Sequence, residues 1–504
     1  MKNLLKIKNI HIAIIILGIL FNCISIFHPN LWFDEAYSVG LANKSFIDIW
    51  KIGGNDVHPI LYYWILHIIY LFTHNLLGLS INGTIIAYRV FSMICISLLG
   101  ILGFSHIRKD FGEKTGVFFS FFSFFLPVIC IYAAEVRMYS LAVLLVTTLA
   151  IYAYRLFKDD TGIKNWIIFG ITSLACIYVH YYGLMAAGII NCVLLFYFIK
   201  QKRVPSIIKI MVSGAVQLLA YIPWMLYFIK QLGNVSKGFW IGFEFPKTIF
   251  QLIGVQFAGN TERIDAAIGF VLAVVMFGYI IFRLVKNKKS NSEKVDVAAK
   301  AAIGIYLAVI VAAIIITAVM KTSIVYYRYL FVITGLFIFF ISYGISKEKN
   351  KYIIGTICVI TLGFAIWSNY LQISEAYNKN NMTQIDYLKE NVKSGDVFAF
   401  DESNFGTGSV ISLYFTDNKQ IFYNPQNWGV EEAYRAFGDQ LEIHTNTDFL
   451  NECTGRVWVI DSDNFDYYNK VFNNEDFKII SRQTIKTGYE DYTYNMTLIE
   501  RVVK

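Results

Sequence analysis

Long apolar segments dominate this 504-residue sequence and restrict the folds open to it. A helix needs about 20 apolar residues to cross the hydrocarbon core of a bilayer. Only 16% of the residues are charged, against about a quarter in soluble domains, so a purely soluble fold is excluded. Eleven segments are predicted to be membrane-spanning helices: 10–28, 84–106, 115–132, 138–156, 165–180, 183–199, 207–228, 264–285, 301–320, 329–345 and 352–371.

Charge divides the chain into two predicted domains. Residues 1–381 carry 33 lysines and arginines against 16 acidic residues, whereas residues 382–504 carry 11 against 20. We therefore predict a basic transmembrane domain, 1–381, followed by an acidic α/β domain, 382–504. The asymmetry is not a nucleic-acid signal. The seven cysteines contain no close pair, so neither a disulfide framework nor a zinc site is indicated.

The tail has the alternating short apolar runs of a mixed α/β domain. Strands are predicted at Val397–Phe400, Gln420–Tyr423 and Val457–Ile460. A hairpin is predicted from the pair Phe477–Lys486 and Tyr492–Arg501. Helices are predicted at Thr383–Asn391, Val430–Phe437 and Asp466–Phe472.

The segment Ile60–Leu79 decides the sidedness of every later loop. If it does not cross, the Lys and Arg clusters fall on the same side as the N-terminus, as the positive-inside rule requires. If it crosses, the clusters from Arg108 onward fall outside. The first arrangement places the N-terminus in the cytoplasm and the C-terminal domain outside. Ile60–Leu79 then becomes an interfacial helix beginning with Pro59 in its first turn.

This topology brings short polar motifs to the outer face of the membrane. The motifs are Asp34-Glu35, Asp56-Val57-His58-Pro59, Glu135-Val136-Arg137-Met138-Tyr139, His180-Tyr181-Tyr182 and Tyr326-Tyr327-Arg328-Tyr329. Ionisable groups at membrane depth are costly, and their default interpretation is functional. The sidedness was assigned without reference to these motifs, so their convergence supports a site.

Each motif also has a structural alternative. One of the two carboxylates at Asp34-Glu35 can act as a general base, and Glu35 can instead be solvated or support its neighbour. His58 can help to bind an anion or merely cap a helix. Glu135 and Arg137 can bind substrate or close a turn as an ion pair. Arg89 is expected to snorkel to headgroups, while Arg328 can snorkel or reach a phosphate. His180 and Tyr182 can line a cavity or belong to an interfacial aromatic belt.

The three motifs Asp34-Glu35-Ala36-Tyr37-Ser38, His58-Pro59-Ile60-Leu61-Tyr62 and Glu135-Val136-Arg137-Met138-Tyr139 together resemble those of the GT-C superfamily of membrane glycosyltransferases. The likeness covers roughly residues 1–372. It is strongest to the bacterial branch related to protein O-mannosyltransferases and the lipid A aminoarabinose transferase. The family usually has a second proline where this chain has Ile60.

The resemblance implies transfer of a sugar from a polyprenyl-phosphate donor to an acceptor on the outer face of a bacterial cell membrane. The acceptor class stays open between protein, lipid and cell-wall polymer, and nucleic acid is not expected as a partner. Asp34 matches the catalytic carboxylate and Glu35 its neighbour, in a single inverting displacement. His58, Arg137 and Arg328 are expected to bind the donor phosphate. The expected substrate-binding residues are Tyr37, Tyr62, Glu135, Tyr139, His180 and Tyr182.

No metal-ligand cluster stands out in the sequence, so no cofactor is expected, although a divalent ion is not excluded. Two other functions are open to such a chain. A transporter or flippase of a lipid-linked sugar would favour internal repeats and charged or Gly/Pro-broken helices at mid-membrane. The sequence shows no repeat, and the centres of the predicted spans are nearly free of charge. An envelope scaffold acting through residues 382–504 would leave the polar motifs unexplained.

Overall fold

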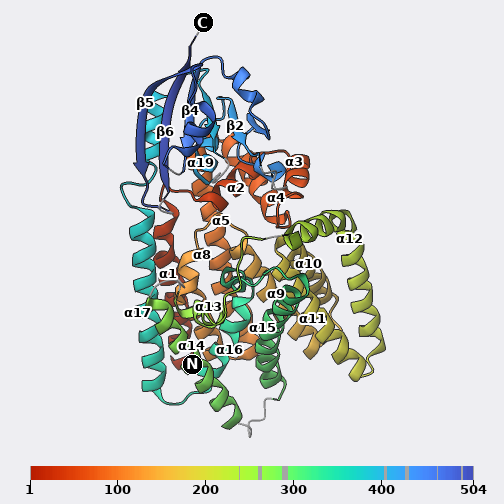
Figure 1. Cartoon of the computed structure of the whole chain (residues 1–504). Coiled ribbons are helices and arrows are strands. Elements are labelled where there is room, and N and C mark those ends of the chain that lie inside the picture. The colour runs from red at the N-terminus through yellow and green to blue at the C-terminus, as the bar shows by residue number, and fades with distance from the viewer. Residues whose placement is uncertain are drawn as a thin grey trace. The chain divides into compact units, whose positions relative to one another are not determined.

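A computed structural model of the chain describes residues 2–237, 239–258, 264–286, 293–401, 406–425, 431–462, 464–489 and 492–502 (Figure 1). The chain forms two compact units. The first unit comprises Met1–Ile26, His58–Tyr62 and Arg89–Gln372. The second comprises Phe27–Val57, Tyr63–Tyr88 and Ile373–Lys504. The division at residue 381, predicted from the charge distribution, stays a prediction.

Helices make up the first unit, and its long members run side by side (Figure 1). Its elements are α1 (Lys2–Cys23), η1 (Ile24–Ile26), the part of α5 (Ile81–Leu102) from Arg89, η3 (Gly103–Ile107), α6 (Arg108–Phe111), α7 (Glu113–Phe125), α8 (Pro127–Tyr132), α9 (Tyr139–Lys158), α10 (Ile163–Val179), α11 (Tyr181–Lys200), α12 (Val204–Lys237), α13 (Lys247–Ala258), α14 (Ile264–Lys286), α15 (Glu293–Met320), η4 (Tyr327–Ile333), α16 (Thr334–Ser346) and α17 (Lys351–Ala376) up to Gln372.

Eight helical segments of the described residues are long and apolar enough to cross a membrane. They are Ile7–Ile26, Ile81–Phe111, Tyr139–Lys158, Tyr181–Lys200, Val204–Ser236, Asp296–Met320, Tyr327–Ser346 and Lys351–Ala376. Two shorter apolar helices, Ile163–Val179 and Ala266–Phe282, coincide with two further predicted spans. The protein is thus a multi-pass helical membrane protein, as predicted.

The remaining predicted span, 115–132, is broken into two helices. Leu126 adopts an extended backbone, with φ −70° and ψ 133°, between α7 and α8. Pro127 follows at the first position of α8. A residue before proline is driven out of the α region by steric clash, and proline itself is tolerated at a helix start. The break is therefore a direct consequence of Pro127.

Small residues allow the helices of the first unit to approach closely. Phe124 of α7 packs against Gly18 of α1 and Gly100 of α5, and a β-carbon on either glycine would overlap its ring. Hydrophobic burial does not drive helices together inside a lipid bilayer. Helices associate there through close van der Waals packing, which small residues allow. A hydrogen bond adds to this packing: Nε2 of His11 in α1 and Oγ of Ser120 in α7 are 2.7 Å apart.

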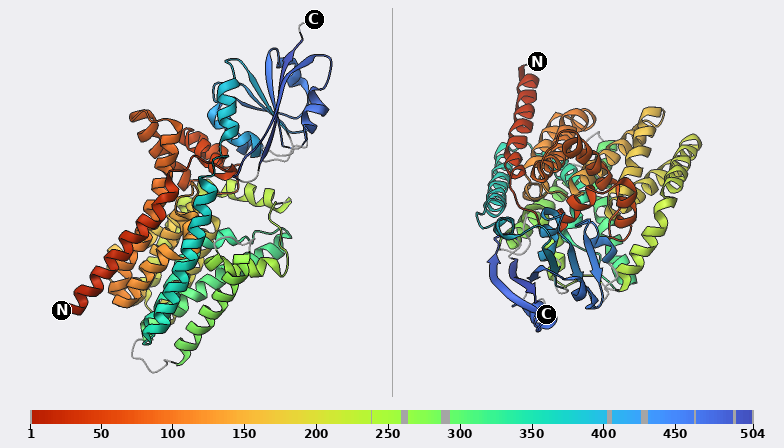
Figure 2. Two further views of the ribbon diagram at one scale, coloured as in Figure 1. Left: turned by 90° about the vertical axis from the view of Figure 1, so that its left-hand side faces the viewer. Right: turned by 90° about the horizontal axis from the view of Figure 1, so that it is seen from above.

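The second unit contains a six-stranded sheet with strand order β3-β2-β1-β4-β6-β5. Helices cover both faces of this sheet (Figure 2). The strands are β1 (Val397–Phe400), β2 (Gln420–Tyr423), β3 (Leu441–His444), β4 (Arg456–Asp461), β5 (Phe477–Lys486) and β6 (Thr493–Arg501). The first four are parallel, and β6 is antiparallel to β4 and β5. The predicted α/β domain and its closing hairpin are confirmed.

The helical elements of the second unit come from two stretches of the sequence, one from α2 to the start of α5 and the other from the end of α17 onward. They are α2 (Phe33–Ala42), α3 (Phe46–Gly53), most of α4 (Leu61–Tyr70), the π-helical η2 (Leu71–Leu76), the start of α5, the end of α17, α18 (Thr383–Asn391), α19 (Gly406–Tyr414), α20 (Glu431–Tyr434), η5 (Asp448–Glu452) and η6 (Tyr468–Phe472). The helix predicted at Val430–Phe437 is shorter than expected, and residue 430 lies outside the described residues. The segment predicted at Asp466–Phe472 is helical throughout, as expected.

The segment predicted to lie at the membrane interface forms α4 and η2. It is not among the eight helices long and apolar enough to span. Ile68, Phe72 and Leu76 are exposed apolar side chains, whereas His67 is buried and its Nδ1 bonds to the carbonyl oxygen of Ala42 at 2.9 Å. One exposed apolar side and one bonded polar side suit an interfacial helix. The helix begins at Leu61, so the prediction that Pro59 lies in its first turn is wrong by two residues.

Candidate functional site

The predicted second loop motif forms the connection between α8 and α9. Two hydroxyl groups hold this loop through its carbonyl oxygens. Ser92 of α5 donates to the carbonyl of Glu135 at 2.7 Å, and Ser140 donates to that of Tyr132 at 2.6 Å. Arg137 is buried, with 3% of its surface exposed, and Glu135 is half-buried. The loop therefore presents its arginine inside the first unit and not to a solvent face.

His180 begins α11 as its N-cap. Its Nδ1 accepts the backbone N–H of Tyr182 at 3.0 Å, which fixes the neutral imidazole with its proton on Nε2. Nε2 is buried and has no hydrogen-bond partner among the described residues, and the same holds for Nδ1 of His58. An unsatisfied buried polar group costs about 1–3 kcal/mol. Two such groups together point to a polar ligand.

Ring contacts bring the predicted residues of the first unit into one cluster, which we call the histidine–arginine cluster: His58, Tyr139, His180, Tyr182, Tyr329, Arg137 and Arg328. The rings of His58 and His180 have centroids 5.2 Å apart. Tyr139 lies 5.8 Å from His180, and Tyr329 lies 5.1 Å from it. Tyr182 packs on Tyr329 at 5.4 Å. These residues come from four separate parts of the sequence.

Charge places the two arginines in the same cluster. Burial lowers the pKa of His180 to about 3, and the positive charge of Arg137 adds to the effect. Burial also lowers the pKa of His58 well below its usual value of 6.5, with further contributions from Arg137, His180 and Arg328. Both histidines are therefore neutral beside two permanent cations. A cluster of this kind attracts an anion, and its neutral imidazoles can donate hydrogen bonds without adding charge.

Arg328 enters from the segment before α16. Its guanidinium lies 5.5 Å from the ring centroid of Tyr326, at the start of η4. Tyr182 holds the segment that precedes Arg328 in the chain, because its hydroxyl donates to the carbonyl of Ile324 at 3.0 Å. Tyr62, the last residue of the His58 segment in this unit, is fully buried and packs near Phe91 at 6.2 Å.

Arg89 was expected to snorkel to headgroups, and that prediction is wrong. Its side chain is completely buried, at 0% exposure. Arg89 precedes Ser92 by three residues on α5, and residues three apart lie on the same helix face. Ser92 bonds to the Glu135 loop, so Arg89 faces that loop too. No signal in the local sequence separates this buried arginine from a snorkelling one.

The two acidic residues of the first motif lie in the second unit. Asp34 and Glu35 form the first turn of α2, where the helix dipole favours negative charge. Asp34 is half-buried and Glu35 is 1% exposed, so the solvated alternative for Glu35 is wrong. Ser38 donates to the backbone carbonyl of Asp34 at 2.9 Å. Tyr37 is buried and packs on Tyr63, with ring centroids 5.9 Å apart.

The α2 helix packs on the C-terminal part of the same unit. Phe33 and Tyr37 both contact Phe437, with ring centroids 5.1 Å and 5.7 Å apart. Lys44, just after the helix, forms an ion pair with Asp439. The α/β domain therefore supports the helix that carries the predicted base.

One group of described residues has the composition of a metal site: Glu442, His444 and Glu452. Lys419 lies among them, with its ammonium 3.0 Å from Glu442 and in contact with Glu452. The lysine already neutralises these exposed carboxylates, so the group is explained as a surface ion-pair network.

The fold and the site define a multi-pass membrane protein with a buried cationic cluster, a separate carboxylate-bearing helix and a C-terminal α/β domain. No protein-family model matches the sequence, and no curated protein matches it at the sequence level.

Among solved structures, the chain is similar to ArnT from Cupriavidus metallidurans. The apo structure matches with TM-score 0.62 and 9% identity over 97% of each chain. The structure bound to undecaprenyl phosphate matches with TM-score 0.61 and 10% identity over 98% of each chain. Archaeal oligosaccharyltransferase AglB from Archaeoglobus fulgidus matches with TM-score 0.45 and 10% identity over 89% of this chain and 69% of that one. The match to ArnT confirms the predicted fold, a multi-pass helical membrane part with a C-terminal α/β domain.

Proposed function

We propose that this protein is a membrane glycosyltransferase that transfers a sugar from a polyprenyl-phosphate donor to an acceptor. The observation that carries the proposal is the histidine–arginine cluster, in which two permanent cations adjoin two neutral histidines with unsatisfied buried nitrogen atoms. A phosphate would satisfy both the charge and the hydrogen-bonding capacity of this cluster.

The nature of the donor is supported by the fold. The ArnT structure with which this chain shares its fold over 98% of its length is bound to undecaprenyl phosphate. A lipid-borne phosphate also suits a cluster formed by residues at the ends of membrane helices, because the lipid chain can stay in the hydrocarbon. Arg137 and Arg328 would bind the phosphate oxygens, and His58 and His180 would donate to them.

The chemistry is a single displacement at the anomeric carbon of the sugar. The acceptor oxygen or nitrogen forms a bond to this carbon as the bond to the phosphate oxygen breaks, which inverts the configuration. Asp34 takes the proton of the acceptor, and the polyprenyl phosphate leaves with the electron pair of the broken bond. Positive charge at the cluster stabilises the negative charge that develops on this leaving group.

Asp34 is the better base of the two adjacent carboxylates. Its side chain is half-exposed, so an acceptor can reach it, whereas Glu35 is buried among its neighbours. Glu35 would have a structural role in α2 and would not take part in the reaction. Tyr37 in the second unit, and Tyr62, Glu135, Tyr139 and Tyr182 in the first, would bind the substrate.

The reaction would take place on the extracytoplasmic face of a bacterial cell membrane. The basis is the distribution of lysine and arginine, which puts the polar motifs on the side opposite the basic loops. The acceptor would be a protein, a lipid or a cell-wall polymer reached from that side.

The test compares Asp34→Asn with Asp48→Asn, a matched change at an exposed carboxylate of the neighbouring helix α3. Each purified protein is incubated with radiolabelled polyprenyl-phosphate sugars and membrane extract, and the labelled product is identified. Binding of undecaprenyl phosphate is measured in parallel. We expect Asp34→Asn to lose transfer by at least 100-fold and to bind undecaprenyl phosphate normally, because a general base contributes about 100- to 10,000-fold.

Asp48→Asn should retain both activities. The mechanism is overturned if Asp34→Asn transfers sugar at the normal rate. Failure of every variant and of the wild type to bind undecaprenyl phosphate would overturn the donor class.

A further inference from the structure

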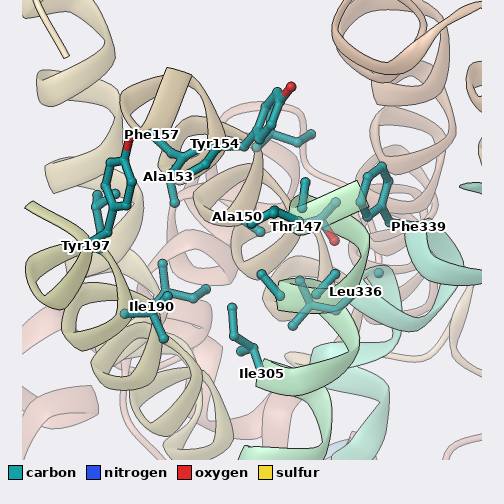
Figure 3. A pocket seen from close by; sticks show the side chains of 18 of the residues that line it. Thr147, Ala150, Ala153, Tyr154, Phe157, Ile190, Tyr197, Ile305, Leu336 and Phe339 are labelled. Carbon is teal, nitrogen blue, oxygen red and sulfur yellow. The ribbon is translucent and has the colours of Figure 1, made fainter. Parts of the chain in front are cut away.

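An apolar cavity of about 330 Å³ lies within the first unit, away from the histidine–arginine cluster. The C-terminal halves of α9 and α11 form two of its walls, and the start of α15 and part of α16 form others (Figure 3). Single residues of η3, α6 and α7 complete the lining: Ile107, Phe111 and Phe119. Figure 3 shows Thr147, Ala150, Tyr154 and Phe157 along α9, with Ile190 and Tyr197 of α11 and Ile305 of α15 also lining the space.

The cavity extends along half the thickness of a bilayer. On α9 its lining runs from Thr147 to Phe157, ten residues that rise about 15 Å along the helix. The hydrocarbon core of a membrane is about 30 Å thick, so this depth is that of a single leaflet. We call the end of the cavity near Thr147 and Gly335 of α16 the deep end, and the end near Phe157 and Lys200 the shallow end.

The lining selects for hydrocarbon. Alanine, isoleucine, leucine, valine and aromatic side chains predominate, and Lys200 is the one charged side chain among the lining residues. The hydroxyl of Thr147 already donates to the carbonyl of Val143 at 2.6 Å, so it requires no ligand. Val193, Phe196 and Val297 belong to the lining and are themselves exposed, which leaves the cavity a side facing the lipid.

Positive charge surrounds the shallow end. Lys200 ends α11, and the exposed Lys158 ends α9, whose last turns line the same cavity. Exposed Lys202 lies two residues after Lys200, whereas Arg203 is already paired with Asp160 at 3.3 Å. A lysine near a membrane surface is worth about 1 kcal/mol in attraction to anionic lipid. The charge therefore complements a phosphate headgroup at the end of the cavity where a chain would enter.

We propose that this cavity binds one acyl chain of an anionic phospholipid, with the lipid phosphate held by Lys200. The lipid belongs to the leaflet on the basic side of the first unit. This inference does not depend on the proposed sugar transfer. The cavity is lined by the C-terminal halves of α9 and α11, whereas the histidine–arginine cluster lies at their N-terminal ends.

The position of the cluster shows that the occupant of the cavity has a headgroup site of its own. Arg137 precedes α9 by two residues, and Phe157 lies at the other end of that helix. The helical residues 139–156 lie between them and rise about 27 Å, close to the thickness of the hydrocarbon core. A lipid whose phosphate is bound at Arg137 therefore belongs to the opposite leaflet from a lipid whose phosphate is bound at Lys200.

The experiment uses the full-length protein in nanodiscs with phosphatidylglycerol that carries a photoreactive diazirine near the end of one acyl chain. After irradiation, the labelled peptides are identified by mass spectrometry. We expect labels on α9, α11 and α15 within the cavity. Ala150→Phe and Ala301→Phe fill the space and should abolish these labels, whereas Ala318→Phe, an exposed site further along α15, should leave them unchanged.

Headgroup recognition is tested with Lys200→Ala against Lys164→Ala, an exposed lysine that does not line the cavity. Lys200→Ala should reduce retention of phosphatidylglycerol about five-fold and leave phosphatidylcholine unaffected. Labels spread evenly over all lipid-exposed helices, or persistent in both filled variants, would overturn the proposal. So would labelling of the cavity by a photoreactive polyprenyl phosphate but not by phosphatidylglycerol.

Discussion

Gly40 of α2 lies against the backbone carbonyl of Ala436, so closely that a β-carbon at Gly40 would overlap the carbonyl oxygen. The same β-carbon would lie 3.1 Å from the side chain of Leu413 in α19. Backbone atoms cannot move aside as a flexible side chain can. Glycine at residue 40 therefore allows α2, the helix that carries Asp34 and Glu35, to pack closely on the C-terminal part of the second unit.

Gly40→Ala is expected to weaken the packing of α2 on the C-terminal part of the second unit. Overpacking of a close contact costs about 1–3 kcal/mol, and here α2 would shift by enough to displace Asp34. We expect a lower melting temperature and a lower rate of sugar transfer. Gly455→Ala is the matched control in the same unit, because no atom would lie within 4 Å of its new β-carbon. A Gly40→Ala protein with the stability of the wild type would contradict the importance of the contact.

Arg137→Lys should weaken donor binding although it keeps the charge. Arginine can bind two phosphate oxygens with parallel N–H groups, and lysine acts as a point charge. We expect the Kd for undecaprenyl phosphate to rise about 10- to 100-fold, as for the loss of a charge-assisted hydrogen bond of about 1.5–3 kcal/mol. Arg203→Lys, at an arginine that pairs with Asp160 at 3.3 Å, should leave the Kd unchanged. Equal effects from both variants would indicate a non-specific contribution of charge.

Hydropathy was enough to predict most of the membrane fold, because every predicted span contains a helix. The exceptions have local physical causes. The helix α13, Lys247–Ala258, is too short to be recognised as a span. Strand β3 alternates Glu442 and His444 with apolar residues at the edge of the sheet, and α19 is rich in glycine and serine and resembles a loop. The sheet order itself depends on contacts distant in sequence.

The site was only partly predictable for a similar reason. Motif residues such as His58, Arg137 and His180 could be chosen from sequence because polar groups are rare in an apolar background. Arg89 could not be assigned correctly, because a buried and a snorkelling arginine look alike until the neighbouring helices are placed. The seating of α2 against Phe437 had no local signal, since about 400 residues separate the partners.

The neutral state of His180 predicts that the protein loses stability in mild acid. The unfolded histidine binds a proton below a pH of about 6.5, whereas burial beside Arg137 holds the pKa of the folded one at about 3. Between these values the unfolded state binds more protons, so stability falls as the pH falls, by about 1.4 kcal/mol per pH unit. The loss is absent above pH 7 and complete near pH 3.

His180→Gln separates this effect from general acid denaturation. Its amide oxygen can accept the N–H of Tyr182 as the imidazole does, but it does not titrate. Melting temperatures of wild type and variant are compared at pH 7.5 and pH 5 in the same detergent. We expect the wild type to lose more stability than His180→Gln. An identical loss in both proteins would mean that His180 is protonated in the folded state.

Ser92 offers a test of whether the loop that carries Arg137 must be held in place. Ser92→Ala removes the hydroxyl that donates to the carbonyl of Glu135, which costs about 1 kcal/mol of stability. Ser97→Ala removes a hydroxyl of the same helix that bonds only back to Met93, so it should be neutral. If Ser92 positions the loop, Ser92→Ala should lower kcat and leave the KM for the acceptor unchanged. Ser92→Thr keeps the hydroxyl and should restore the rate, whereas a purely structural role would lower the melting temperature with no selective effect on kcat.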